Sequence, residues 1–521
     1  MPSRKGFVDV SAKIIADVSS GIYRTPANAL KELISNSFDA DARSAIITTD
    51  YPDFDVITCT DDGDGMTVEK FEDIMSKIGG TDKRATVDRT KSGRPIIGKI
   101  GIGILAIAQI CNKFTVISAT KDEPTRFEAT IDLREFHEQD AYKYHLKDKK
   151  VRIGEYDIED NVPKEETGSS YTRVVMEDID PGFKRRLSEE ENPDKSVAGF
   201  VLDKSDPSTF EEFTDWVKDK RIRNIPEYLR LLWELAVISP IPYFEAGPVP
   251  QSDVMQEIKK RLLGYNFDVI VDGIKLRKPV VFPYKQDTKD PLFDYKTYDF
   301  EFDDIVAGSR LRFHGYIYHQ NKAIQPPELR GILIRIREVG VGSYDKTLLN
   351  FPQSAGPIVS GITGEIYVEE GLETALNIDR NSFRETDPHY LALQEAIFKK
   401  LTGKREQGGV LLDARYRSKQ TNQKKRQIKE VDEFEVFSKA IEEIYGRRFQ
   451  IERVPESGEK PVFIDAKHSK ILLYRNPILP RKQKEKWMLE KVITFYELAT
   501  LSAPSKPSID KLFYAFLAGR H

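Results

Sequence analysis

The stretch that decides the fold is KELISNSFDA, residues 31–40, whose apolar positions recur at helical spacing. On such a helix Glu32 and Asn36 project from one face, because residues four apart are neighbours, and Ala40 lies one turn further on. Asn36 offers a carbonyl oxygen suited to magnesium, and Glu32 offers a carboxylate that can orient and deprotonate a water. This pair alone is also typical of an ordinary solvated helix face.

A second motif, DDGDGM at residues 61–66, follows a short predicted strand. Its two glycines, Gly63 and Gly65, let the backbone approach a ligand closely, and Asp61 can accept a hydrogen bond from an exocyclic amine such as that of adenine. A calcium loop needs acids at alternating positions, and Met66 occupies the third of these. An acidic turn without a ligand is the other interpretation.

A third motif, GKIGIGILA at residues 98–106, places glycines before a predicted helix. Free N–H groups at a helix start bind phosphate oxygens. The preceding residues 79–98 are polar, glycine-bearing and without periodicity, so we expect a mobile lid.

Two other nucleotide motifs nearly fit this region. Residues 93–99 match the first seven positions of a P-loop, but Ile100 replaces the serine or threonine that must bind magnesium. Residues 101–106 also satisfy the dinucleotide pattern G-x-G-x-x-A, with Asp122 near the required distance. A Rossmann unit opens with a long buried strand, however, whereas a polar loop precedes these glycines, so this is the weaker alternative.

In their order along the chain, the three motifs resemble those of the GHKL ATPases, which include gyrase B subunits, MutL, MORC proteins, histidine kinases and the ninety-kilodalton heat-shock chaperones. The resemblance implies that ATP and Mg²⁺ are the cofactors, with Glu32 as general base, Asn36 as magnesium ligand and Asp61 as adenine ligand. It also implies that Thr172 takes the role of the family's threonine, although in GSSYTRVVM Gly168 lies four residues ahead of Thr172 and not directly before it. The residues assigned to nucleotide binding are Asn36, Asp39, Ala40, Asp61, Gly63, Gly65, Met66, Gly98, Lys99, Gly101, Ile102, Gly103 and Thr172.

Further along, GILIRIREVGV and ALNIDRNSF resemble the middle domain of the heat-shock chaperones, whose LN-x-x-R motif reaches the γ-phosphate. By that resemblance Arg380 is a catalytic residue that stabilises charge on the transferring phosphoryl group. The other interpretation is an arginine paired to an acid at a helix start.

These patterns predict an α+β protein of several domains, since 521 residues exceed one hydrophobic core. We expect an N-terminal Bergerat-type α/β sandwich over 1–185, a mixed sheet with helices on one face. A helical connector over 186–265, a transducer-like α+β middle domain over 266–410 and a small mixed C-terminal domain over 411–521 follow.

Composition limits the partners and the compartment. A net charge of −4 excludes a chain whose whole surface binds nucleic acid, and only Cys59 and Cys111 are present, which excludes a disulfide framework. With no signal peptide or membrane span expected, the sequence favours a cytoplasmic protein.

The resemblance implies a homodimer that pairs through its N-terminal domains when ATP binds. The basic stretch 404–429 could contact DNA, although a solvated helix is the stronger interpretation, and 430–521 suggests a partner-binding domain. The hypotheses for the output are a DNA-associated or microbial-defence ATPase, a chaperone-like ATPase, or a protein that holds ATP as a structural ligand.

Overall fold

The computed structural model describes most of the chain in two compact units, residues Met1–Arg415 and Tyr416–His521. The described residues are 25–76, 89–98, 107, 109–132, 155–164, 168–188, 200–249, 251–352, 356–377, 380–405, 409–446, 448–475, 486, 489–494 and 497. The first expected helix, before Thr25, and most of the helix expected after Gly98 lie outside these residues.

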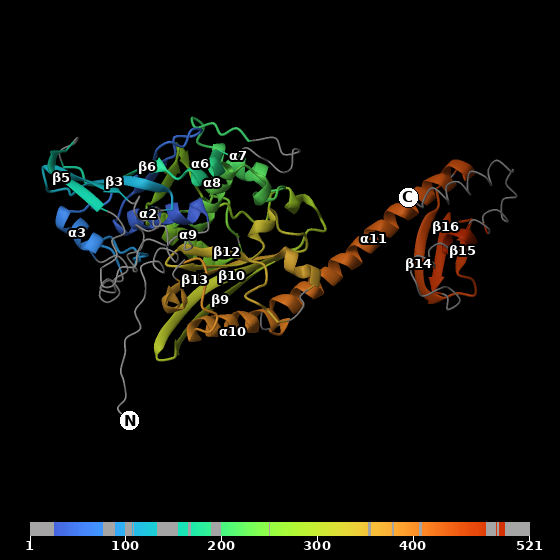
Figure 1. The fold of residues 1–521 in the computed structure, drawn as a ribbon. Helices are drawn as coiled ribbons and strands as arrows, with labels where there is room; N and C mark the ends of the chain where they lie inside the picture. The colour runs from blue at the N-terminus through green and yellow to red at the C-terminus, as the bar shows by residue number, and fades with distance from the viewer. Residues whose placement is uncertain are drawn as a thin grey trace, which may run out of the picture. The chain divides into compact units, whose positions relative to one another are not determined.

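An eight-stranded sheet forms the centre of the N-terminal half of the first unit, in the order β5-β4-β3-β6-β2-β1-β7-β8. Strands β3, β5 and β6 of this sheet are labelled in Figure 1. All neighbours are antiparallel except β1 and β7. The strands are β1 Ser44–Thr48, β2 Ile57–Asp61, β3 Cys111–Ala119, β4 Thr125–Asp132, β5 Glu155–Pro163, β6 Tyr171–Ile179, β7 Asp268–Val271 and β8 Ile274–Lys275. A mostly antiparallel sheet of this kind excludes the Rossmann alternative, which requires parallel strands.

Helix α2, Pro26–Asp39, carries the first motif and packs against both β1 and helix α8. Proline at its first position is compatible with a helix start, because that residue has no intrahelical N–H partner to lose. Its apolar residues Leu30, Ile34 and Phe38 are fully buried. The other helices of this half are α3 Val68–Ser76, α6 Pro181–Ser188, α7 Thr209–Val217, α8 Glu227–Ile238 and α9 Asp253–Gly264.

The strand FDVIVDG corrects one expected boundary. Its residues, 267–273, fall in the middle domain expected over 266–410, but β7 pairs in parallel with β1, with Ser44 opposite Asp268 and Ile47 opposite Val271. The segment therefore completes the first sheet, and a domain boundary at residue 266 would cut that sheet. Period-two alternation predicts a strand but not the strand beside which it will lie.

A second, five-stranded sheet follows in the order β12-β11-β13-β10-β9, with helix α10, Pro388–Thr402, packed against it (Figure 1). Its strands are β9 Tyr295–Val306, β10 Ser309–Gln320, β11 Gly331–Ile336, β12 Val339–Asp345 and β13 Ile362–Glu370. One hydrophobic core extends from Ala27 of α2 to Tyr367 of β13. The two sheets thus share apolar packing, and the second sheet also forms a core of its own with α10, which includes Leu311, Ile366 and Leu393.

Helix α11, Val410–Tyr445, leads into the second unit. That unit contains a three-stranded sheet of β14 Gln450–Ser457, β16 Lys470–Arg475 and β15 Val462–Asp465, in that order. The inward side chains Val462, Ile464, Ile471 and Leu473 are buried. None of the described helices has the length and apolar character needed to cross a bilayer. The α+β class is confirmed.

Candidate nucleotide site

The predicted general base, Glu32 of α2, is buried and contacts an arginine. Glu32 is 3% exposed, and its Oε2 lies 3.0 Å from Nη1 of Arg380. Its other carboxylate oxygen, Oε1, is buried and has no hydrogen-bond partner among the described residues. Glu32 and Arg380 line a cavity of about 10 Å³ together with Lys31, Ser35 and residues of β11 and β12. Such a space matches one water molecule, which an unpaired carboxylate oxygen can bind.

Arg380 reaches this site from the loop that follows the second sheet. Its Nη2 donates to the carbonyl of Ile97 at 2.8 Å while Nη1 contacts Glu32. Arg337, at the end of β11, likewise donates to the carbonyl of Ile96 at 3.0 Å. Arg380 is thus paired to an acid, as our alternative held, but that acid is the predicted catalytic base.

Asp39 joins the end of α2 to the beginning of the third motif. Its carboxylate accepts hydrogen bonds from the N–H groups of Ile97 at 2.8 Å and Gly98 at 2.6 Å. Burial nevertheless raises the pKa of Asp39 to about 6, because these hydrogen bonds only partly offset desolvation. A Cβ on Gly98 would lie 3.0 Å from Asp39 Oδ2 and 3.5 Å from Oδ1 of Asn36, which is exposed. The face of α2 that carries Asn36 and Asp39 therefore lies beside the backbone of Gly98.

The described part of the expected lid, residues 89–98, is fastened to α2. Arg94 is 4% exposed and donates to the carbonyls of Phe38, Ala42 and Tyr265. The first two are buried carbonyls at the end of α2 and just beyond it, and Arg94 supplies the donors that the helix itself does not. The lid movement of residues 79–98 stays a prediction, because residues 79–88 lie outside the described part; in this structure the described end is held to α2 by these contacts.

Asp61 ends β2 and points toward α2. It is 8% exposed, and its carboxylate accepts from the Gly63 N–H at 3.0 Å and contacts the Ser37 hydroxyl at 3.1 Å. Burial raises the pKa of Asp61 to about 6. Thr172 is its partner residue on the neighbouring strand β6, so their side chains share one face of the sheet. The structure thus brings the two predicted base-binding residues together despite the altered GSSYT spacing.

The DDGDGM turn packs between α2 and β3. Ala40 accepts a hydrogen bond from the N–H of Asp64 at 2.8 Å, and the Met66 N–H donates to the hydroxyl of Ser118 at 3.0 Å. Gly65 has a φ of +67°, and a Cβ there would lie 2.0 Å from the carbonyl oxygen of Ala119. Only glycine fits that position, as the close approach in this turn requires.

Four predicted phosphate-binding residues, Lys99, Gly101, Ile102 and Gly103, lie outside the described residues. Sequence reasoning also missed several residues that the structure adds to the site, namely Ser37, Ser118, Arg94 and Arg337. Ser37 carries a local signal, because it follows Asn36 and lies one turn beyond Leu33, whose carbonyl it also contacts at 3.0 Å. The other three become visible only through tertiary contacts.

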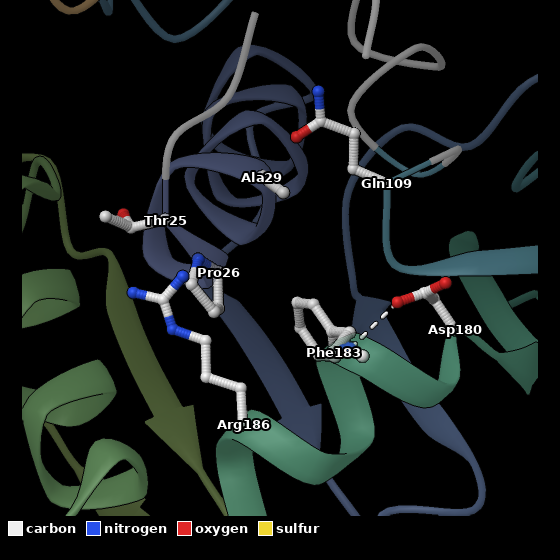
Figure 2. A pocket seen from close by; sticks show the side chains of 8 residues that line it. Thr25, Pro26, Ala29, Gln109, Asp180, Phe183 and Arg186 are labelled. Atoms are coloured by element: carbon white, nitrogen blue, oxygen red, sulfur yellow. Dashed lines mark hydrogen bonds between the residues drawn. The ribbon is translucent and has the colours of Figure 1, made fainter. Parts of the chain in front are cut away.

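A larger cavity of about 220 Å³ lies at the opposite end of α2 (Figure 2). In its wall the Phe183 N–H donates to Asp180 at 2.8 Å, and Arg186 of α6 points toward the first residues of α2. None of the predicted site residues lines it. Its lining residues are Thr25, Pro26, Ala29, Gln109, Asp180, Gly182, Phe183 and Arg186.

Comparison with known proteins agrees with this geometry. Residues 23–168 match the family described as "Histidine kinase-, DNA gyrase B-, and HSP90-like ATPase". This part of the chain is therefore a GHKL-type ATPase domain with the Bergerat fold, as the resemblance implied.

Two curated proteins are similar to shorter parts of the chain. A "Putative type II restriction enzyme HgiDII" of Herpetosiphon aurantiacus is 34% identical over 117 residues, which are 22% of this chain and 18% of that protein. A "Chaperone protein HtpG" of Halalkalibacterium halodurans is 27% identical over 144 residues, 24% of this chain and 23% of that protein. The chain thus matches about a fifth of the length of each relative, and neither similarity defines an output for the ATPase domain.

Proposed function

We propose that the chain is an ATP-hydrolysing conformational switch that uses magnesium and pairs as a homodimer when ATP is bound. The observation that carries this proposal is the unpartnered Oε1 of Glu32 beside a one-water cavity, with Arg380 on the other carboxylate oxygen. A buried polar atom without a hydrogen-bond partner destabilises the fold, so its retention here favours a role in binding the attacking water.

The residues present fit an adenine nucleotide with its metal. Asp61 and Thr172 present hydrogen-bonding groups at the base end, and Gly98 leaves open the space that a side chain would fill beside Asn36 and Asp39. Asn36 would supply one oxygen ligand to magnesium, whose other ligands are typically phosphates and waters. Bound magnesium would neutralise charge on the phosphates.

In this proposal Glu32 orients a water and accepts its proton, and Arg380 exchanges its contact with Glu32 for the phosphate. The exchange links hydrolysis to ATP, because the base becomes free of its cation only when the phosphate competes for Arg380. Slow turnover follows from this requirement. Closure of the loop 79–98 and pairing of two N-terminal domains would accompany the ATP state.

The test of ATP hydrolysis by this site is Glu32→Gln, a substitution that preserves the shape of the side chain. We expect ATP hydrolysis to fall by about a hundredfold or more while the Kd for ATP changes little. Ser188→Ala, a solvent-exposed substitution on α6, serves as the control. Wild-type turnover in Glu32→Gln would remove this carboxylate from the mechanism, and a wild type that binds ATP without hydrolysis would leave ATP as a structural ligand.

For the output, a DNA-associated or defence role is favoured by the basic segment of α11. Residues 414–429 contain seven lysines and arginines and no acid, and Lys419, Lys424 and Lys425 are exposed. A helix that is polar all round and basic can follow a phosphate backbone. The restriction-enzyme relative is compatible with this role, and the HtpG relative supports the chaperone-like alternative.

The two outputs separate in one experiment. ATPase turnover is measured with and without duplex DNA, in the wild type and in Lys419→Gln/Lys424→Gln/Lys425→Gln. We expect DNA stimulation that weakens with salt and with the triple substitution. The control replaces Lys399, Lys467 and Lys470, which are outside this segment. Turnover indifferent to DNA, with suppression of client aggregation, would support the chaperone-like alternative instead.

A further inference from the structure

Three polar side chains form a row across the centre of the first sheet. Asp61 of β2 is the register partner of Thr172 of β6, and Thr172 is in turn the register partner of Ser118 of β3. Partner residues on antiparallel strands point to the same face, so the three side chains follow one another across that face. Ser118 is fully buried. It belongs to none of the three sequence motifs, so it was not predicted as a site residue.

The hydrogen bonds of Ser118 have only one consistent direction. Its hydroxyl lies 2.9 Å from the carbonyl oxygen of Tyr171, which can only accept, so the single Ser118 proton is used there. The Met66 N–H donates to the same hydroxyl oxygen at 3.0 Å. The remaining contact, 3.0 Å to the Thr172 hydroxyl, must then be a bond in which Thr172 donates to Ser118. Ser118 thus accepts two hydrogen bonds and donates one, and its capacity is filled.

We infer that Ser118 is a positioning residue that sets the nucleobase preference of the site by accepting the hydrogen bond of the Thr172 hydroxyl. This inference rests on the proposed function, because it concerns the base end of the same nucleotide site. With its proton directed to Ser118, Thr172 presents only oxygen lone pairs to a ligand. Asp61, as a carboxylate, is also an acceptor.

The row therefore presents two hydrogen-bond acceptors to the base, the Asp61 carboxylate on β2 and the Thr172 hydroxyl oxygen on β6. An amine at position 6 of a purine, as in adenine, donates hydrogen bonds and matches this arrangement. An oxo group at position 6, as in hypoxanthine or guanine, places an acceptor against acceptors and leaves them unpaired. A site whose buried polar groups are left unpaired rejects a ligand more strongly than a site that merely lacks a contact.

Ser118→Ala tests this assignment, with ATP and ITP as the probes and calorimetric Kd values as the readout. Without Ser118, the Thr172 hydroxyl can rotate and donate to a 6-oxo group. We expect the preference for ATP over ITP to fall about tenfold, the effect of one buried hydrogen bond. Thr115→Val is the matched control, because Thr115 is also a hydroxyl residue of β3 but its alternation places it on the opposite face, beside Thr130.

Two further variants keep the test decisive. Ser118→Cys retains the size of the side chain but accepts hydrogen bonds weakly, so it should shift the preference in the same direction if Ser118→Ala does not fold. In a Thr172→Val background, Ser118→Ala should change the ATP to ITP ratio no further, because Ser118 acts through Thr172.

The outcomes are distinguishable from failure of the proposed function. A wild type that binds neither nucleotide overturns both. A wild type that binds ATP, with Ser118→Ala or Ser118→Cys retaining the wild-type ATP to ITP ratio, overturns only the role of Ser118. The same holds if the Ser118 effect persists in full when Thr172 is valine.

Discussion

The affinity of the base end for adenine should fall as the pH is lowered from 7 to 5. Burial raises the pKa of Asp61 to about 6, mainly by desolvation and with a further contribution from the Asp62 charge. The Gly63 N–H, the Ser37 hydroxyl and the backbone of Thr172 act in the opposite direction. Because the adenine amine is a donor, the ligand selects the carboxylate form, and protonation of Asp61 competes with binding.

The magnitude follows from the fraction of Asp61 that is ionised. With a pKa of about 6, roughly 90% is carboxylate at pH 7 and roughly 10% at pH 5. The Kd should therefore rise about tenfold over this interval, which corresponds to about 1.4 kcal/mol. Binding near pH 6 should also release a proton, so the calorimetric heat should depend on the ionisation enthalpy of the buffer.

Adenosine is the ligand for this assay, because it carries no phosphate and is insensitive to groups at the phosphate end. Asp39 also has a pKa raised to about 6 by burial, and with ATP its protonation would mix with that of Asp61. Asp39→Asn should therefore keep the pH dependence of adenosine binding. Asp61→Asn should remove it and weaken binding at pH 7.

Unfolding does not explain such a loss. A folded-state pKa above the unfolded value means that the native state binds the proton more tightly, so Asp61 stabilises the fold more as the pH falls through 6. Its contribution to the free energy of unfolding thus has the opposite sign to the change in affinity, and a melting curve at each pH monitors this. A Kd for adenosine that is constant between pH 5 and 7 would refute the assignment of Asp61 as the adenine ligand.

Three further predictions follow from the contacts around the site. Gly65→Ala should lower the free energy of unfolding by about 1–3 kcal/mol in a urea titration, because the new Cβ would clash with the carbonyl of Ala119. Gly93→Ala is the control and should cost less, because Gly93 also has a positive φ (+90°) but nothing lies within 4 Å of the new Cβ. Arg94→Met should cost about 2–4 kcal/mol in the same assay, since it leaves two buried carbonyls and one partly buried carbonyl without their donor. Asp39→Ala should weaken ATP binding several-fold by calorimetry and leave adenosine binding unchanged; an equal loss for both ligands would contradict a role at the phosphate end.

The parts of the site that were predicted from the sequence are those within short segments. Glu32 and Asn36 lie on one helix, and Asp61 and Gly65 on one turn, so helical spacing and turn chemistry suffice to relate them. Thr172 required only the pairing of two predicted strands. The motif order then predicted their approach, and the described contacts confirm that Asp61 and Thr172 are neighbours.

The residues that were not predicted depend on chain segments that meet only in the folded protein. Arg94 contacts a carbonyl 171 residues away, at Tyr265, and no local pattern marks an arginine in a polar loop as a helix cap. Similarly, the alternation in β7 predicts a strand, but its partner β1 lies far away in the sequence, before strands β2 to β6 and helices α6 to α9. Ser118 is a lone serine in an apolar strand, and its role depends on hydrogen-bond directions across three strands.

The way the second sheet is attached limits how Arg380 can leave Glu32. Arg335 and Glu365 are fully buried, joined at 2.8 Å, and Arg335 also donates to the carbonyl of Val237 at the end of α8. Both members of this ion pair belong to the second sheet, so separating the sheet from α8 would keep the pair. It would leave the buried Val237 carbonyl without its donor, at a cost of about 1–3 kcal/mol, and would expose the apolar core that α8 shares with this sheet. A hinge between the sheets is therefore an expensive way to move Arg380.

The loop that carries Arg380 offers a cheaper movement. Its ends are joined by a β-bridge between Leu376 and Phe383, and the Asn377 N–H donates to the carbonyl of Ser382 at 3.0 Å. Arg380 has a φ of +49°, a left-handed conformation that costs a residue with a side chain about 1–2 kcal/mol. Its contacts with Glu32 and Ile97 hold Arg380 in that conformation. A phosphate that competes for those contacts would also release that conformation. Exchange of Arg380 between carboxylate and phosphate thus requires rearrangement of a short closed loop, while the buried junction of the two sheets stays intact.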